Sequence, residues 1–259
     1  MTKLEYTFKT DTLFKMLFVQ YPDLLKQLVS ELLEIPLTNI EKLEIKNPEM
    51  PPEIMGDKFC RLDINMIVNG QLVDLELQVR DEGDYPERVL YYWAREYSSS
   101  LPASGKYINL PRTIVISIIN FNQLECKEFH SEFRPLEVTR HELLTDKMSL
   151  HFFELQKLPK DIPANNMLLL WLALFKADTR EELDELKSLE VPVMEQAINA
   201  YNTITVSPEF RNLAKMREDA YYNEAAALHN AEQKGEKRII DLLKNGVSPD
   251  ELIRDFENK

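Results

Sequence analysis

RLDINMIVNGQLVDLELQV, residues 61–79, contains two runs of alternating apolar and polar residues that are joined by Asn69 and Gly70. An Asn-Gly pair between such runs favours a two-residue type I′ turn, because both turn positions need a positive φ that these residues tolerate. The segment therefore predicts a β-hairpin whose strands cover residues 60–68 and 71–79.

The turn decides which residues of the two strands lie opposite each other. It brings Val68 opposite Gln71, and the same register brings Asp63 directly opposite Glu76. Because successive side chains point to opposite faces of a strand, the hairpin residues fall into two sets. One set is apolar and is expected to face a core: Leu62, Ile64, Met66, Val68, Val73, Leu75, Leu77 and Val79. The other set is polar: Arg61, Asp63, Asn65, Asp74, Glu76 and Gln78.

The opposed carboxyl groups of Asp63 and Glu76 are the candidate reactive centre. Opposed residues of a hairpin have Cβ atoms roughly 5 Å apart, where like charges destabilise the sheet unless a cation or open water lies between them. Mg²⁺ suits this position because it binds carboxylate oxygens and keeps several waters, and Mn²⁺ or Ca²⁺ would accept the same ligands. Such an ion would activate a water and stabilise charge on a phosphate oxygen. The alternative is an ordinary amphipathic hairpin with a solvated polar face.

The segments around the hairpin predict an α/β fold. Apolar periodicity and turn residues predict the other elements. Helices are expected over residues 11–33, with a second start near Tyr21, over 86–100 and from about 164 onward; strands are expected over 112–121, near 128–134 and near 149–155. The strand over 112–121 is almost continuously apolar, which is typical of burial on both faces. We therefore expect a mixed central sheet flanked by helices, followed by a helical C-terminal region.

Three residues of the helix expected over 86–100 share one face, because Arg88, Tyr92 and Arg95 are spaced i, i+4 and i+7. Guanidinium groups suit phosphate contacts, and a tyrosine ring suits stacking on a base. We interpret this face as a nucleic-acid contact. The alternative is that Arg88 and Arg95 form ion pairs with acidic neighbours on a solvated helix.

Composition limits the classes of protein further. The net charge of −13 argues against a nonspecific nucleic-acid coat and favours DNA binding only through a local basic groove or bridging metal ions. Cys60 and Cys126 lie in no Cys-x-x-Cys motif, so we expect ordinary thiols. The N-terminus has no apolar leader, and the longest apolar run, residues 167–175, is too short to span a bilayer. These features predict a cytoplasmic protein without a membrane segment.

Several segments, taken in order, resemble the Rpn family of recombination-promoting nucleases, also described as transposases, within the PD-(D/E)XK superfamily. The resemblance covers roughly residues 6–160. The segments that carry it are FKTDTLFKMLF (8–18), RLDINMIVNGQLVDLELQVR (61–80), YPERVLYYWAREYSSSLPASGKY (85–107), TIVISIINF (113–121) and HELLTDKMSLHFFELQKLPK (141–160).

The resemblance implies a restriction-endonuclease-like fold, Mg²⁺-dependent cleavage of DNA and a bacterial cytoplasmic setting. The family's two acidic motif residues fall on Asp63 and Glu76, and its N-terminal acid falls on Asp11, which would add a carboxylate if it packs near the hairpin. The lysine of the superfamily signature falls on Gln78. Because glutamine is neutral, either turnover is slow or a neighbouring cation replaces the lysine. The candidates for that cation are Arg61, Arg80 and Lys106.

The leading hypothesis is a metal-dependent DNA endonuclease that promotes recombination or mobile-element activity. In it, Asp63 and Glu76 hold Mg²⁺ with the backbone carbonyl of Leu77, and Gln78 orients the attacking water. Arg88, Tyr92 and Arg95 contact the DNA. The alternative is a catalytically weak or inactive nuclease fold that acts as a DNA-binding or protein-interaction module, and a third hypothesis is an enzyme that cleaves RNA.

The expected domain organisation has three parts. A PD-(D/E)XK nuclease-like domain covers residues 1–165, a helical extension covers 166–225 and a helical tail covers 226–259. The acidic C-terminal helices are interpreted as the contact of a homodimer. The alternative is that they cover the core of their own chain.

Overall fold

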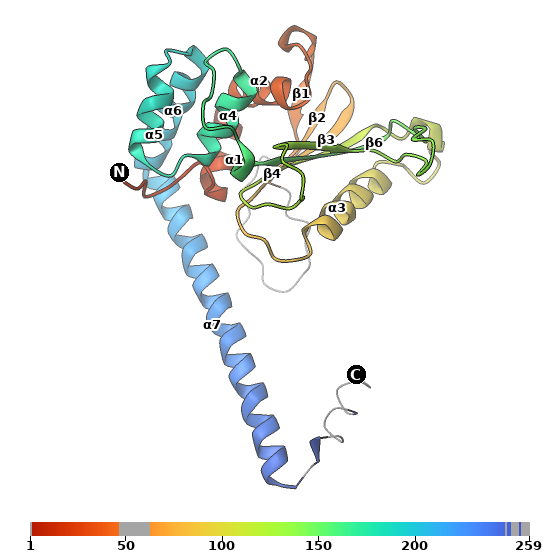
Figure 1. Ribbon diagram of the computed structural model, residues 1–259, viewed down its shortest axis with the longest axis vertical. Coiled ribbons are helices and arrows are strands. Elements are labelled where there is room, and N and C mark those ends of the chain that lie inside the picture. The colour runs from red at the N-terminus through yellow and green to blue at the C-terminus, as the bar shows by residue number, and fades with distance from the viewer. Residues whose placement is uncertain (1, 47–62, 247, 250–253, 255–259) are drawn as a thin grey trace. The chain divides into compact units, whose positions relative to one another are not determined.

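A computed structural model describes residues 2–46, 63–246, 248–249 and 254, and it contains the expected hairpin (Figure 1). Strands β2 (Ile64–Val68) and β3 (Gln71–Gln78) pair antiparallel, with Val68 opposite Gln71. The predicted register is therefore confirmed. Residues 60–62 of the expected first strand lie outside the described residues.

Six strands form one mixed sheet in the order β1-β2-β3-β4-β6-β5. The other four strands are β1 (Leu43–Ile45), β4 (Thr113–Ile119), β5 (His130–Phe133) and β6 (Met148–Glu154). β4 pairs parallel with β3 and β6, and the other neighbours pair antiparallel. β4 is buried along its whole length, which confirms the strand predicted over residues 112–121. The sequence does not predict β1, because three residues carry almost no periodic signal.

Asn69 connects the hairpin turn to the segment before β1. Asn69 and Gly70 have φ values of 49° and 80°, the positive values that a type I′ turn requires. The Asn69 Oδ1 accepts hydrogen bonds from the backbone N–H groups of Glu41 at 3.0 Å and Lys42 at 3.1 Å. Its Nδ2 donates to the backbone carbonyl of Asn39 at 2.7 Å. The residue that makes the turn therefore also positions the chain that enters β1.

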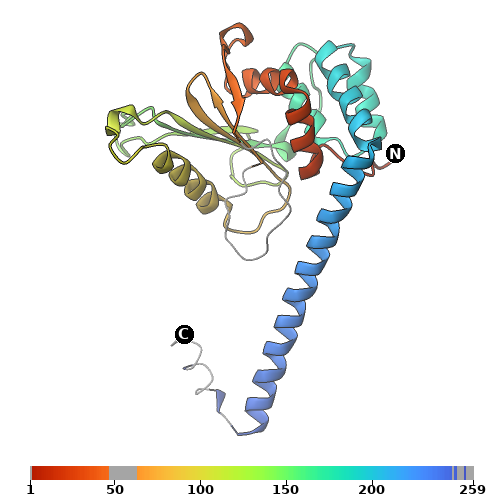
Figure 2. The ribbon, with the colours of Figure 1, turned by 180° about the vertical axis from the view of Figure 1, so that it is seen from behind.

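Helices cover both faces of the sheet, and the helices after β6 form the C-terminal part of the sequence. They are α1 (Asp11–Gln20), α2 (Pro22–Leu32), α3 (Tyr85–Ser99), α4 (Met167–Lys176), α5 (Arg180–Ser188), α6 (Pro192–Val206) and α7 (Pro208–Lys244), with short 3-10 helices η1 (Leu37–Asn39), η2 (Tyr107–Asn109) and η3 (Leu155–Lys157). The break between α1 and α2 confirms the second helix start at Tyr21. In Figures 1 and 2, α3 lies on one side of the sheet, and α1, α2 and α4 lie on the other.

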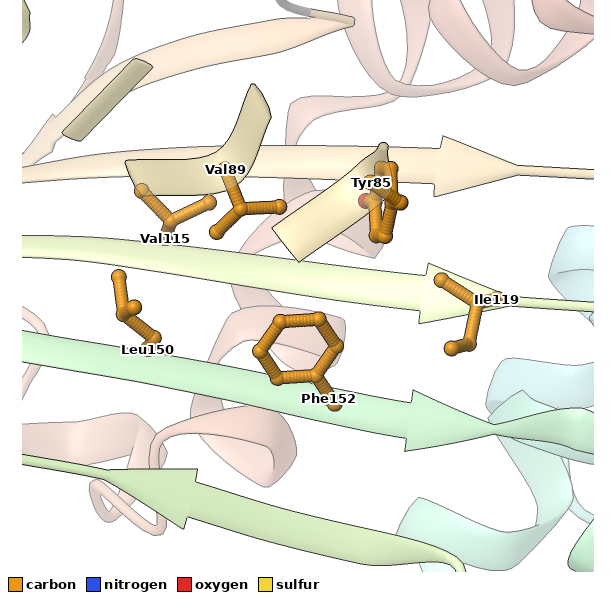
Figure 3. Packing of buried hydrophobic residues seen from close by; sticks show 6 residues of the cluster. All are labelled: Tyr85, Val89, Val115, Ile119, Leu150 and Phe152. Carbon is orange, nitrogen blue, oxygen red and sulfur yellow. The ribbon is translucent and has the colours of Figure 1, made fainter. Parts of the chain in front are cut away.

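α3 packs on the central strands through a hydrophobic cluster, which Figure 3 shows from close by. Its members come from α3, β4 and β6: Tyr85, Val89, Val115, Ile119, Leu150 and Phe152. The opposite face of β4 is also buried, with Ile114, Ile116 and Ile118 at most 1% exposed. Both faces of the sheet are therefore packed, and side chains of β3 that share the α3 face are covered rather than solvated.

The chain divides into two compact units, Met1–Phe210 and Arg211–Lys259. The first unit contains the sheet and α1 to α6, and the second contains most of α7. α7 ends at Lys244, and Gly246 follows with a φ of 88°, the left-handed conformation that is typical of a helix C-terminus. The expected domain boundaries at residues 165 and 225 stay predictions. None of the helices in the described part of the chain is long and apolar enough to cross a membrane.

Candidate active site

Asp63 and Glu76 meet at the open end of the hairpin. Asp63 immediately precedes β2, and Glu76 lies in β3. The backbone N–H of Asp63 donates to Oε1 of Glu76 at 3.0 Å, and the backbone N–H of Leu77 donates to Oδ2 of Asp63 at 2.7 Å. These two bonds extend the hairpin pairing by one residue pair beyond Ile64 and Leu75. They hold the two carboxyl groups next to each other at the end of the hairpin.

Burial changes the protonation of both acids. Glu76 is 6% exposed, and Asp63 is half-buried. Burial raises the pKa of Asp63 to about 6, although the Leu77 N–H and the charges of Lys15 and Arg88 act to lower it. Burial, followed by the adjacent charge of Asp63, raises the pKa of Glu76 well above its ordinary value. The pair therefore holds a proton far more readily than two exposed carboxyl groups do.

This donor set fits a divalent cation. Two carboxylates and the neighbouring main-chain carbonyl of Leu77 are oxygen ligands of the kind that Mg²⁺ prefers, and a cation relieves the repulsion between buried like charges. Among the described residues, no three or more His, Cys, Asp and Glu side chains are grouped to hold a metal ion. The remaining ligands of such a cation would therefore be waters and oxygen atoms of the substrate.

A layer of buried polar side chains surrounds Glu76 beneath α3. Glu76 lies beside Ser117 of β4, which is fully buried. Tyr85, at the start of α3, is 1% exposed, and burial followed by the charge of Glu76 raises the pKa of its hydroxyl. Asp74, two residues before Glu76, is also fully buried and accepts a hydrogen bond from the Asn65 amide. Alternation along the strands predicts this polar face, but not that a helix covers it.

Arg88 is the α3 residue whose charge acts on the acidic pair. Its guanidinium forms an ion pair with Glu82 at 2.7 Å and lies 5.0 Å from the centre of the Tyr85 ring. Its charge acts to lower the pKa values of Asp63 and Glu76. The ion pair with Glu82 agrees with the alternative interpretation of Arg88, and its contact with nucleic acid stays a prediction.

The other predicted site residues lie at different distances from the pair. Tyr92 and Arg95 lie further along α3, where Tyr92 is half-buried and Arg95 is exposed. The side chain of Gln78 donates to the backbone carbonyl of Arg80 at 2.8 Å. Asp11 is the exposed first residue of α1 and forms no three-acid group with the pair. The structure therefore brings Asp63 and Glu76 together and directs the Gln78 amide to the main chain.

Lys15 of α1 is a charged residue near the pair that the sequence analysis does not select. It lies within a run of buried residues and is 7% exposed, and its charge acts on Asp63. One signal in the sequence points to it: Lys15 interrupts an apolar run between Phe14 and Met16. That signal says that the lysine is buried, but not which side chain it approaches.

A mixed sheet with two acids joined across a hairpin, and helices on both faces, is an arrangement consistent with the PD-(D/E)XK restriction-endonuclease-like fold. The chain matches the family model of the PD-(D/E)XK nuclease family transposases over residues 8–231, and it belongs to that family. No curated protein and no solved structure matches the chain. Family membership supports a nuclease- or transposase-related role with DNA as the substrate class. The match also extends past residue 160 and includes α4 to α6.

Proposed function

We propose that this protein is a Mg²⁺-dependent endonuclease that hydrolyses DNA phosphodiester bonds and promotes recombination or mobile-element activity. The observation that carries the proposal is the pair of half-buried Asp63 and buried Glu76, whose carboxyl groups each accept a hydrogen bond from a main-chain N–H of the pair's own segment. Two ionised carboxylates opposed across a hairpin destabilise the fold when no cation lies between them. Their oxygen atoms are also the ligands that a divalent cation prefers.

Each residue near the pair has a defined part in this proposal. Asp63, Glu76 and the carbonyl of Leu77 bind the cation, which supplies Lewis acidity and an activated water when it is bound. Arg88 contacts a phosphate oxygen of the DNA with its guanidinium, and Tyr92 and Arg95 extend this contact along α3. Gln78 orients the attacking water once its amide leaves the Arg80 carbonyl.

Cleavage of supercoiled plasmid DNA tests the proposal. We expect the wild-type protein to nick the plasmid in Mg²⁺ and to stop when the metal is chelated. Asp63→Asn removes a cation ligand and is expected to lower the rate at least about a hundredfold, the range found when one group that stabilises charge is removed. Asp146→Asn is the matched control, because Asp146 is an exposed loop residue before β6 and should leave the rate unchanged. Undiminished nicking by Asp63→Asn contradicts the assignment.

A second candidate function follows from Gln78, whose side chain is bound to the main chain. A nuclease fold without an effective site would act as a DNA-binding or protein-interaction module. Calorimetric titration with Mg²⁺ and Mn²⁺ separates the two functions. A protein that binds neither ion but still binds DNA is the module rather than the enzyme.

The homodimer expected from the sequence stays a prediction. Within its own unit, α7 exposes several large apolar side chains that a partner helix would cover: Tyr222, Ile239, Ile240 and Leu243. Two-fold symmetry would also suit cleavage of both strands of a duplex. We expect light scattering to give twice the chain mass of 30.4 kDa, and a single-chain mass at high protein concentration would remove this prediction.

A further inference from the structure

We propose that Lys15 of α1 binds the scissile phosphate beside Asp63 and takes the place of a cation that β3 lacks at position 78. This inference deepens the proposed nuclease function and rests on it. The acidic pair is then flanked by two cations from different helices, Lys15 from α1 and Arg88 from α3.

The position of Lys15 is the first support. In both ribbon views, α1 lies next to the end of the sheet from which β3 leads into the loop before α3 (Figures 1 and 2). Asp63 is at this same end, because it precedes β2 and lies opposite Glu76 near the end of β3. The electrostatic influence of Lys15 on Asp63 agrees with this placement.

The lack of a direct partner is the second support. Lys15 is 7% exposed, yet its ammonium makes no hydrogen bond or ion pair with any residue in the described ranges. A buried charge without a bonded partner destabilises a fold, and an apolar side chain would pack there at a lower free energy. Perturbed, poorly compensated charges of this kind concentrate at functional sites.

Lys9 shows what a structural lysine looks like in the same region. It is 9% exposed, close to the value for Lys15. Its ammonium, however, donates to the backbone carbonyl of Lys176 at 2.7 Å and lies 2.8 Å from the carboxylate of Asp178. The two lysines therefore share burial and differ in partners, which makes Lys9 the matched control for Lys15.

The chemistry needs a cation where Lys15 lies. In phosphodiester hydrolysis the water oxygen forms a bond to phosphorus while the bond from phosphorus to the leaving sugar oxygen breaks. One proton of the water passes to solvent, and the leaving oxygen takes up a proton from solvent. Negative charge grows on the non-bridging oxygens during this step, and an ammonium that donates to one of them stabilises it. Glutamine at position 78 has no charge to offer.

Lys15→Met tests the inference with readouts that separate chemistry from folding. We expect the rate of cleavage at saturating DNA to fall about a hundredfold. Mn²⁺ affinity, measured by calorimetry, should stay the same or increase, because a positive charge near Asp63 is removed. The melting temperature of the metal-free protein should not fall. Lys9→Met should instead lower the melting temperature and leave the cleavage rate of the folded protein unchanged.

A second variant distinguishes a direct role from a structural one. Lys15→Met combined with Gln78→Lys places an ammonium on β3 beside the acids, and we expect it to recover at least a tenth of the wild-type rate. Wild-type cleavage by Lys15→Met, or a loss that only follows lost Mn²⁺ binding or lost folded protein, overturns the inference. If Asp63→Asn still abolishes cleavage in that case, the proposed function stands without it. A wild-type protein that cleaves no DNA overturns both.

Discussion

Replacing Glu76 by glutamine is expected to abolish metal-dependent cleavage and to raise the melting temperature of the metal-free protein at pH 8. The two effects have one cause. The Glu76 carboxyl binds the proposed cation when it is ionised, and its ionisation without a cation destabilises the fold because it is 6% exposed and adjacent to Asp63. Glutamine keeps an oxygen that accepts the Asp63 N–H and has no charge. The cleavage rate should fall at least about a hundredfold.

The pH dependence follows from the direction of the pKa change. The folded-state pKa of Glu76 is raised, so its stabilising contribution is complete below about pH 4.3, the ordinary glutamate value, and is lost as the pH rises through the folded-state pKa. Each unit of separation between the two pKa values is worth about 1.4 kcal/mol, and each kcal/mol changes the melting temperature of a chain of this size by about 2–4 °C. The variant should therefore melt at the wild-type temperature near pH 4 and several degrees higher at pH 8.

Thermal melting in a chelator across this pH range measures the effect. Glu185→Gln is the matched control, because Glu185 is exposed on α5 and its replacement should not change the pH profile. A Glu76→Gln protein that melts below the wild type at pH 8 would show that its ionised carboxylate stabilises the fold, contrary to this account.

Phe18→Ala is expected to lower the free energy of unfolding by about 3–5 kcal/mol, the range for removing a large buried aromatic ring. Phe18 is fully buried, and its ring centre lies 5.0 Å from that of Phe14, 6.2 Å from that of Trp171 and 6.3 Å from that of Phe175. Removing the ring leaves a cavity where α1 packs against α4, and few of its neighbours can move into it.

Urea unfolding followed by circular dichroism measures this loss. Phe18→Leu is the control, since it keeps most of the side-chain volume and should cost less than half as much. If the alanine variant loses less than about 1 kcal/mol of unfolding free energy, the side chains between α1 and α4 have moved to fill the cavity, contrary to this prediction. The same variant should also lower cleavage, because α1 carries Lys15.

The hairpin was predictable because two local signals agree. Alternation assigns the faces of the strands, and Asn69-Gly70 sets the register, so the meeting of Asp63 and Glu76 follows without any long-range information. The central strand β4 was predictable for a similar reason, since its continuous apolar run suits burial on both faces.

The rest depends on contacts between segments that are distant in the chain. Nothing near Asp74 in the sequence indicates that α3 covers it, and nothing near Lys15 indicates that α1 approaches Asp63. Gln78 shows the same limit, because its bond to the Arg80 carbonyl depends on how the chain leaves β3. β1 was missed since its partner strand, and not its own three residues, holds it in the sheet.

The parallel pairing of β4 with both β3 and β6 has a consequence during synthesis of the chain. Leu72 pairs with Thr113, and Thr113 pairs with Met148, so each parallel ladder must wait for a long stretch of polypeptide to leave the ribosome. Until β4 is made, β3 of the hairpin has unpaired backbone N–H and C=O groups along the side that β4 will occupy. Nascent chains are most prone to aggregate through these groups.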